Sequence, residues 1–412
     1  MGCGALLAAV VAARALHPLR PAAVDAPLGV LGQTVPHSPS VGLYVHVPFC
    51  TKRCYYCSFN TAPLERPAEM RRYVGAVRRE IGLLAGASWA SGLGIATIFL
   101  GGGTPSLLAA DDLAALLDDV RAAFALAPGA EITVECNPES VDGVKLAAYR
   151  TAGVNRISLG VQSLDDEILP RLGRLHDAHG ARAAFEAARE AGCDNVSVDL
   201  MYGLPGQDPA RWARSVEGVL GWEPEHLSAY GLTLDAGSLW AVTGVEGLPA
   251  EGAVVEQYWA LARAAATRGF EHYEISNYAR PGFRSRHNQV YWRAAEYLAV
   301  GPGACGFVGD VRYANVKAVP RYCATLEAGA LPIDTSECLT PRQRLGERLI
   351  LGLRLVDGVP RTWLDARGEG DAALARTLAT WYQAGLLVER DERVALTEAG
   401  FLVSDALFVE LV

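Results

Sequence analysis

After residue 41 the sequence alternates short β-branched runs with longer segments rich in Ala, Leu and Arg, and it repeats this alternation six times. Such alternation is typical of βα units, whose strands lie parallel in one sheet with helices packed on it. The expected strands are 43–47, 97–100, 132–136, 156–159, 195–200 and 226–230. The expected helices are 68–84, 111–124, 144–152, 178–191 and 209–220. We therefore predict an α/β fold built around a parallel sheet.

The length of the chain allows more than one domain. Its 412 residues exceed one small core and suffice for a barrel of ~250 residues with satellites. Hydrophobic residues make up 50% and charged residues 20%, which are the proportions of a globular protein. The formal net charge of −9 argues against a nucleic-acid partner, because phosphate binding needs clustered Lys and Arg.

The first 41 residues differ in kind from the rest of the chain. They are Ala-rich and then Pro-rich, and no acidic residue precedes Asp25. We expect 1–41 to be an unstructured or targeting-like extension outside the fold, either an organellar transit sequence or the product of a start codon placed too far upstream. The apolar run 5–13 is shorter than the roughly 20 residues of a membrane helix, so we expect no stable membrane insertion.

Residues 42–248 contain the βα units and form the predicted barrel. Beyond them the rhythm fades into a barrel extension at 249–339, with a helix near 254–268 and an aromatic stretch at 273–297.

The last part of the chain, 340–412, is predicted to form a small winged-helix-like domain. It combines helices near 341–355 and 372–384 with a two-stranded wing at 386–397. We interpret it as a docking or lid module, because it lacks the basic excess of a DNA-binding surface.

Three cysteines follow the first expected strand within one short loop. Cys50, Cys54 and Cys57 have the spacing C-x-x-x-C-x-x-C, which lets them surround a single cubane. A 4Fe–4S cluster usually has four cysteine ligands, so three leave one iron open to a small chelating molecule. The alternatives are a zinc site, for which His46 is the nearby extra donor, a disulfide, or inert buried thiols.

The loop after the second expected strand is Gly-Gly-Gly-Thr-Pro, residues 101–105. Consecutive glycines let a backbone approach a ligand closely and leave its amides available for hydrogen bonding. With the hydroxyl of Thr104, this loop could hold the amine and carboxylate of an amino acid. A plain structural bend is the alternative.

Polar residues stand where the next strands end. Glu135 and Asp199 close strands three and five, Gln162 follows strand four, and Arg174 lies in the segment after it. Ligands of such folds bind at the carboxyl ends of the strands, so these side chains are expected to converge on one mouth. For any one of them, an internal salt bridge at the rim is the alternative.

The segment His287-Asn-Gln-Val-Tyr-Trp292 is the last one that we single out. A histidine can ligate heme iron, and flanking aromatic rings can stack on a porphyrin. His287 is therefore a heme-ligand candidate. Its alternative is a structural role, with His287 and Asn288 bonded inside a polar network.

Together these features resemble the radical S-adenosylmethionine (SAM) superfamily and, within it, the oxygen-independent coproporphyrinogen III oxidase family. The resemblance runs from about Leu43 onward and rests on the cysteine loop, with Tyr56 before its last cysteine, on Gly-Gly-Gly-Thr-Pro, and on Asp199-Leu-Met-Tyr-Gly-Leu-Pro-Gly-Gln207. It implies a partial (β/α)6 TIM-like radical SAM barrel with an α+β extension and the small C-terminal domain.

The resemblance also implies roles for individual residues. Cys50, Cys54 and Cys57 would hold a 4Fe–4S cluster, and the methionine part of SAM would chelate the fourth iron before one electron breaks its sulfur–carbon bond. The positions that match a first SAM site are Tyr44, Gly102, Thr104 and Glu135. Those that match a second SAM site are Tyr56, Gly103, Gln162, Arg174 and Asp199. No catalytic residue is assigned.

One departure distinguishes this chain from the true oxidases, which have a further cysteine where it has Phe59. Together with the segment at His287, this looks like the sister branch of heme chaperones, called HemW. Membership would imply a protein that binds heme and passes it to heme-requiring apoproteins such as cytochromes, with an electron donor for the cluster. The alternatives are SAM-dependent decarboxylation of coproporphyrinogen III in porphyrin biosynthesis and a zinc-stabilised binding protein.

A cytoplasmic location is expected, because thiol-ligated iron is oxygen-sensitive and an export signal is missing. Because of the unusual N-terminus, an organellar location is the alternative.

Overall fold

A computed structural model describes residues 20–21, 29–32 and 34–411 of the chain. Its main feature is one 13-stranded sheet with a run of parallel strands at its centre. In spatial order these parallel strands are β12 (Tyr297–Val300), β2 (Ser40–Val47), β5 (Gly94–Gly102), β6 (Ala125–Cys136), β7 (Arg156–Gln162), β8 (Val196–Tyr202) and β9 (His226–Gly231). The six strands expected from the sequence are all present and lie in chain order.

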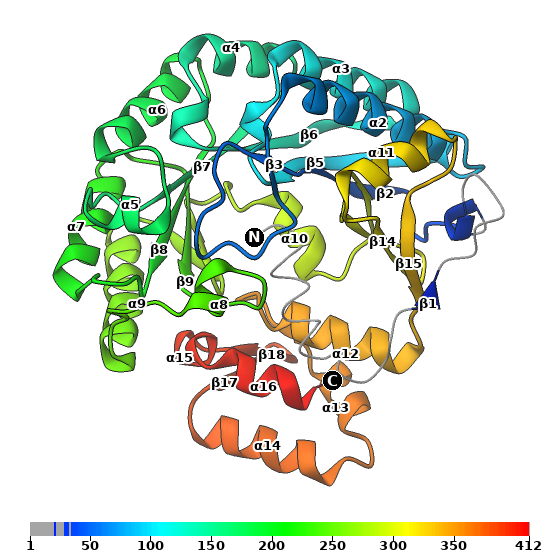
Figure 1. The fold of residues 1–412 in the computed structure, drawn as a ribbon. Coiled ribbons are helices and arrows are strands. Elements are labelled where there is room, and N and C mark those ends of the chain that lie inside the picture. The colour runs from blue at the N-terminus through cyan, green and yellow to red at the C-terminus, as the bar shows by residue number, and fades with distance from the viewer. Residues whose placement is uncertain (1–19, 22–28, 33, 412) are drawn as a thin grey trace.

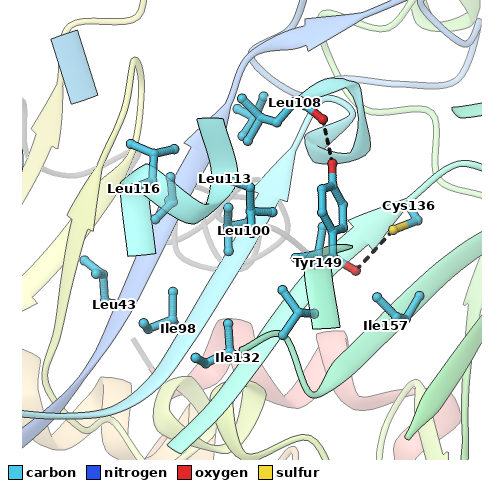
Figure 2. Close-up of a cluster of buried hydrophobic side chains, with 14 of the residues drawn as sticks. Leu43, Ile98, Leu100, Leu108, Leu113, Leu116, Ile132, Cys136, Tyr149 and Ile157 are labelled. Carbon is cyan, nitrogen blue, oxygen red and sulfur yellow. Dashed lines mark hydrogen bonds between the residues drawn. The ribbon is translucent and has the colours of Figure 1, made fainter. Parts of the chain in front are cut away.

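Helices cover the outer, convex face of this sheet (Figure 1). They are α2 (Pro67–Ala85), α3 (Ala110–Ala123), α4 (Gly143–Thr151), α5 (Ile168–Leu172), α6 (Ala178–Glu190), α7 (Pro209–Leu220) and α9 (Glu251–Thr267). Figure 2 shows part of the core between them, with Leu113 of α3 beside Leu100 of β5 and Tyr149 of α4 pointing toward Leu108. The Tyr149 hydroxyl donates a hydrogen bond to the Leu108 carbonyl at 2.7 Å, so its one polar atom is satisfied.

Strand alternation aims polar side chains into the barrel. Along β6, Ile132 and Val134 belong to the hydrophobic core, whereas Thr133 and Glu135 face the other way. Arg156 of β7 pairs with Thr133 in register and is 2% exposed. The interior of this barrel is therefore more polar than the usual filling of Val, Ile and Leu.

Strand β6 begins at Ala125, seven residues before the expected start at 132. Pro128 and Gly129 looked like a turn. The structure keeps them in the strand, because the register between β5 and β6 shifts between Ile95 and Thr97 and so accommodates the extra residues.

The prediction that 1–41 lies outside the fold is wrong for the part that the structure describes. Strand β1 (Arg20–Pro21) pairs with β15 (Ile333–Cys338). Leu31, in a 3-10 helix at Gly29–Gly32, is fully buried in the main core. The backbone amides of His37 and Ser38 donate to Glu296. The targeting interpretation concerns residues 1–19 and 22–28, which lie outside the described residues.

The barrel extension adds strands to both edges of the sheet. Antiparallel β11 (Asn277–Ala279) and β10 (Glu271–Glu274) follow β9, and β13 (Cys305–Val308), β14 (Val311–Asn315) and β15 follow β12. Between them lie α10 (Arg286–Trp292) and, after β14, α11 (Val319–Glu327). The aromatic stretch at 273–297 is thus two short strands and a helix that end in β12.

The C-terminal part has its own core around Leu349, Val394 and Leu407. Its helices are α12 (Pro341–Gly352), α13 (Arg361–Gly368), α14 (Ala372–Gln383), α15 (Glu398–Leu402) and α16 (Ser404–Glu410). The expected wing is present as β17 (Leu387–Arg390) and β18 (Arg393–Leu396), and the short strand β16 (Val359–Pro360) adds a third member.

None of the helices in the described part of the chain has both the length and the apolar character of a bilayer-spanning segment.

Candidate functional site

The cysteine loop leaves β2 and is held by backbone hydrogen bonds at several points. Strand β3 (Phe49–Cys50) pairs with β4 (Ala62–Pro63), which closes the loop at its base. The Tyr55 amide donates to the Leu172 carbonyl at 3.1 Å, and the Cys57 amide to the Cys54 carbonyl at 3.2 Å. The polypeptide therefore fixes the course of this loop through its own backbone.

The glycine loop packs directly under the cysteine loop. The Gly103 amide donates to the Val47 carbonyl and the Thr104 amide to the Phe49 carbonyl, both at 2.7 Å. The Gly102 amide donates to Glu135 Oε2 at 3.1 Å. The expectation that these amides stay available to a ligand is wrong, because they bind neighbouring protein atoms.

Gly103 is required by this close approach. A Cβ atom there would lie 2.5 Å from the Phe49 carbonyl oxygen and 2.9 Å from that of Val47. No side chain fits between two backbones at this distance, so the glycine lets the loops touch.

A cavity of about 280 Å³ opens at the carboxyl ends of the parallel strands. All three loop cysteines line it, together with most of the residues predicted to bind SAM. These are Tyr56, Gly102, Gly103, Thr104, Glu135, Gln162, Arg174 and Asp199. The polar side chains that were expected to converge at the mouth of the barrel thus line one cavity.

Tyr44 lies behind this cavity and does not line it. Its side chain is 1% exposed, stacks on Phe99 and shares a 2.9 Å hydrogen bond between its hydroxyl and His46 Nδ1. Its ring also lies against Gly101. From there Tyr44 supports the glycine loop by packing.

Arg174 is the cation of the site. Its guanidinium donates to Asn137 Oδ1 at 2.9 Å and to the Gly160 carbonyl at 2.6 Å, and it lies 3.7 Å from Cys54 Sγ. Burial pushes the pKa of Arg174 down, but the nearby Tyr56 and Cys54 outweigh it and hold that pKa above its ordinary value. A permanent positive charge therefore lies beside the Cys54 sulfur.

The other two thiols are costly to ionise without a positive partner. Burial raises the pKa of Cys50 to about 11, and burial also raises the pKa of Cys57. A loop that places three cysteine sulfurs on one cavity therefore suits a cationic metal centre, since coordination keeps cysteine deprotonated.

Two carboxylates form the other side of the cavity. Removal from water raises the pKa of Glu135 to about 7 and raises the pKa of Asp199. Ser158 donates to both carboxylate oxygens of Asp199 at 3.2 Å. These acids lie on β6 and β8, on either side of β7, and can accept hydrogen bonds from hydroxyl or ammonium groups of a ligand.

Gln162 has a backbone conformation that few residues adopt. Its φ is +67°, in the left-handed region that costs energy for a residue with a side chain. Its Nε2 would lie 3.1 Å from a Cβ at Gly160, so the glycine makes room for it. This strained residue at the end of β7 carries its amide into the cavity.

Asn137 is a site residue that sequence reasoning missed. Its Nδ2 donates to Thr104 Oγ1 at 3.2 Å while its Oδ1 accepts from Arg174, so it joins the glycine loop to the cation. The sequence signal that could have identified Asn137 is its position before Pro138, directly after a strand.

The donor set does not suit zinc. His46, the extra donor considered for zinc, has Nδ1 bonded to the Tyr44 hydroxyl and Nε2 bonded to the Asn60 carbonyl, each at 2.9 Å. In the described part of the chain, no three His, Cys, Asp or Glu side chains are grouped around a single ion. Zinc needs thiolates ~2.3 Å from one centre, whereas a cubane spreads its ligands over separate irons.

His287 lies away from the cavity and is fully buried. Its Nδ1 shares a 2.8 Å hydrogen bond with the Thr97 hydroxyl and its Nε2 one with the Tyr291 hydroxyl. Burial lowers the pKa of His287 to about 3, so the ring is neutral. With both nitrogens hydrogen-bonded, His287 has the structural role considered as the alternative, and in this arrangement neither of its nitrogens is free to ligate heme iron.

A barrel of parallel strands with three thiols and a polar cavity at its mouth defines the class of radical SAM proteins. Residues 44–217 match the Radical SAM superfamily, and residues 339–403 match the HemN C-terminal domain. The fold is similar to that of the coproporphyrinogen III oxidase HemN from Escherichia coli, with a TM-score of 0.80 over 92% of each chain at 23% identity. The predicted fold class is confirmed.

The sequence is 37% identical to the heme chaperone HemW of Mycobacterium tuberculosis over 93% of this chain and 97% of that one. It is 32% identical to the heme chaperone HemW of Bacillus subtilis over 89% and 97% of the two chains. This chain belongs to the HemW family of radical SAM proteins. Membership in the superfamily implies a 4Fe–4S cluster and SAM as cofactors.

Proposed function

We propose that this protein binds heme and delivers it to heme-requiring apoproteins. The observation that carries the proposal is similarity to heme chaperones along almost the whole chain, C-terminal domain included. Phe59, which lines the cavity where the oxidase resemblance expects a further cysteine, points the same way. Cytochromes are the recipients that we expect.

The cluster is held, in this proposal, by Cys50, Cys54 and Cys57. A 4Fe–4S cluster with one open iron can chelate the amine and carboxylate of SAM and supply an electron to its sulfonium. Arg174 keeps a positive charge next to Cys54 throughout. An electron donor from outside the chain is required, and a reducing compartment, the cytoplasm or an organelle interior, suits the cluster.

SAM is held, in this proposal, by polar side chains that line the same cavity as the cysteines. Glu135 and Asp199 accept hydrogen bonds from its hydroxyl or ammonium groups, and Gln162 and Thr104 supply further polar atoms. Tyr56 and Gly103 complete the second of the two SAM positions considered above, and Tyr44 with Gly102 supports the first.

The affinity for SAM should rise with pH. Glu135 accepts hydrogen bonds best as a carboxylate, and its pKa of about 7 means that it is protonated below neutrality and ionised above it. We expect SAM to bind several-fold more tightly at pH 8 than at pH 6, measured by calorimetry on the anaerobically reconstituted protein. Glu135→Gln should lose most of this dependence. A wild-type affinity that falls with pH would contradict the role of Glu135.

The function itself is tested by heme transfer. Anaerobically reconstituted protein should develop a Soret band with added hemin and, after removal of free hemin, pass it to an apo-cytochrome that then shows its own spectrum. Bovine serum albumin loaded with hemin is the control for passive release. Failure to bind hemin would end the proposal, whereas conversion of coproporphyrinogen III to protoporphyrinogen with SAM would favour decarboxylation.

A further inference from the structure

Exposed large hydrophobic side chains recur in one segment that borders the cavity. Among the described residues with exposed large hydrophobic side chains, four lie between β9 and α9, in 232–250, which we call the rim segment. They are Leu234 (37% exposed), Leu239 (49%), Val242 (81%) and Leu248 (45%). Single exposed leucines are ordinary, but four exposed apolar side chains in one short segment next to a cavity point to a binding surface.

The rim segment is fastened to the cysteine loop. The Trp240 amide donates to the Tyr55 carbonyl at 3.0 Å, and Arg53 donates to the Gly237 carbonyl at 2.9 Å. The Ser58 hydroxyl donates to Asp235 at 3.3 Å. In Figure 1 the short helix α8 (Leu239–Thr243) lies beside the blue loop that leaves β3. The exposed apolar residues are thus held next to the proposed cluster.

Helix α8 presents two different faces. Trp240 is buried, and its ring lies 6.4 Å from that of Tyr55 and 6.3 Å from that of Tyr56. Leu239 and Val242, three residues apart, share the opposite side and remain exposed. The inner face therefore supports the cysteine loop, and the outer face has no partner among the residues that the structure describes.

Two cations lie on the cysteine loop where it meets the rim segment. Lys52 and Arg53 are exposed, and both line the cavity at the edge of the cysteine loop. Lys52 Nζ lies 5.3 Å from the centre of the Tyr55 ring, whose backbone carbonyl binds Trp240. The nearby Asp235 accepts from Ser58. In a chain with a net charge of −9, two cations beside an apolar patch favour an apolar ligand that carries negative charge.

We propose that heme docks on the outer face of α8, with its macrocycle on Leu239 and Val242 and its propionates toward Lys52 and Arg53. The inference rests on the proposed heme-binding function and adds where the heme lies. Heme has the required chemistry, a flat apolar ring with two carboxylates at one edge. The site places the cargo at the mouth of the cavity, beside the proposed cluster.

The test compares two substitutions to aspartate with a matched control. Val242 is 81% exposed on the rim, and Val144 of α4 is 83% exposed elsewhere. We expect Leu239→Asp/Val242→Asp to bind hemin about tenfold or more weakly in Soret titrations, because two apolar contacts are replaced by charges that repel propionates. Val144→Asp should match the wild type. Iron and sulfide content should be equal in all three.

A second arm tests the cations with a changed ligand. Hemin dimethyl ester, which lacks free carboxylates, should bind more weakly than hemin. Lys52→Gln should lower the affinity for hemin but leave the affinity for the ester unchanged. Wild-type hemin affinity in Leu239→Asp/Val242→Asp would overturn the docking site while leaving heme binding in place. A wild-type protein that binds no hemin would overturn the proposed function and the docking site with it.

Discussion

A Cys54→Ala variant should come out of anaerobic reconstitution without a 4Fe–4S cluster. Three sulfurs line the cavity, and Cys54 is the one 3.7 Å from the Arg174 guanidinium. Removing it leaves two protein ligands for a cluster that ordinarily has four. Iron and sulfide analysis should fall from about four of each per chain to near zero, and the brown absorbance and the reduced EPR signal should disappear.

Cys338→Ala is the matched control, because Cys338 is an exposed cysteine outside the cavity. This variant should keep the full cluster and its response to SAM. A complete 4Fe–4S signal in Cys54→Ala would show that the ligand assignment is wrong. Loss of the cluster in both variants would mean that the reconstitution, and not the ligand set, had failed.

The second large effect is expected from Gly103→Ala. The added Cβ would meet the Phe49 carbonyl oxygen at 2.5 Å and the carbonyl carbon of Pro48 at 2.9 Å. Backbone cannot rotate away as a side chain can, so one loop must move, at a cost of about 1–3 kcal/mol. We expect a lower free energy of unfolding in urea and a loss of most of the cluster, because the displaced strand β3 contains Cys50.

Gly92→Ala provides the control for this substitution. Nothing lies within 4 Å of a Cβ at Gly92, and its backbone conformation is one that any residue adopts. Its stability and iron content should stay near those of the wild type. Normal stability and iron content in Gly103→Ala would show that the two loops are not held together as described.

The barrel could be predicted because its local signals agree with one another. Helix α7 has the expected bounds, since Asp208 caps it, Pro209 begins it and Gly221 follows its last residue. The strands of the barrel extension were harder to predict from the sequence. Those such as β10 and β11 have only four and three residues, and their pairing depends on contacts far apart in the chain.

The site could be predicted in part for a similar reason. Cysteine spacing is a local property, and the ends of parallel strands must meet at one edge, so the cavity residues were brought together correctly. The use of the glycine amides and the burial of His287 depend on which atoms become neighbours after folding. A sequence pattern names residue types, but it does not say which of their hydrogen bonds the protein itself will occupy.

The backbone hydrogen bonds between the cysteine loop and the glycine loop bear on how a lost cluster could be replaced. Val47 and Phe49 accept hydrogen bonds from the glycine loop, so peptide groups of the chain itself help to fix the base of the cysteine loop. We therefore expect protein that has lost its iron to oxygen to accept a new cluster without first unfolding.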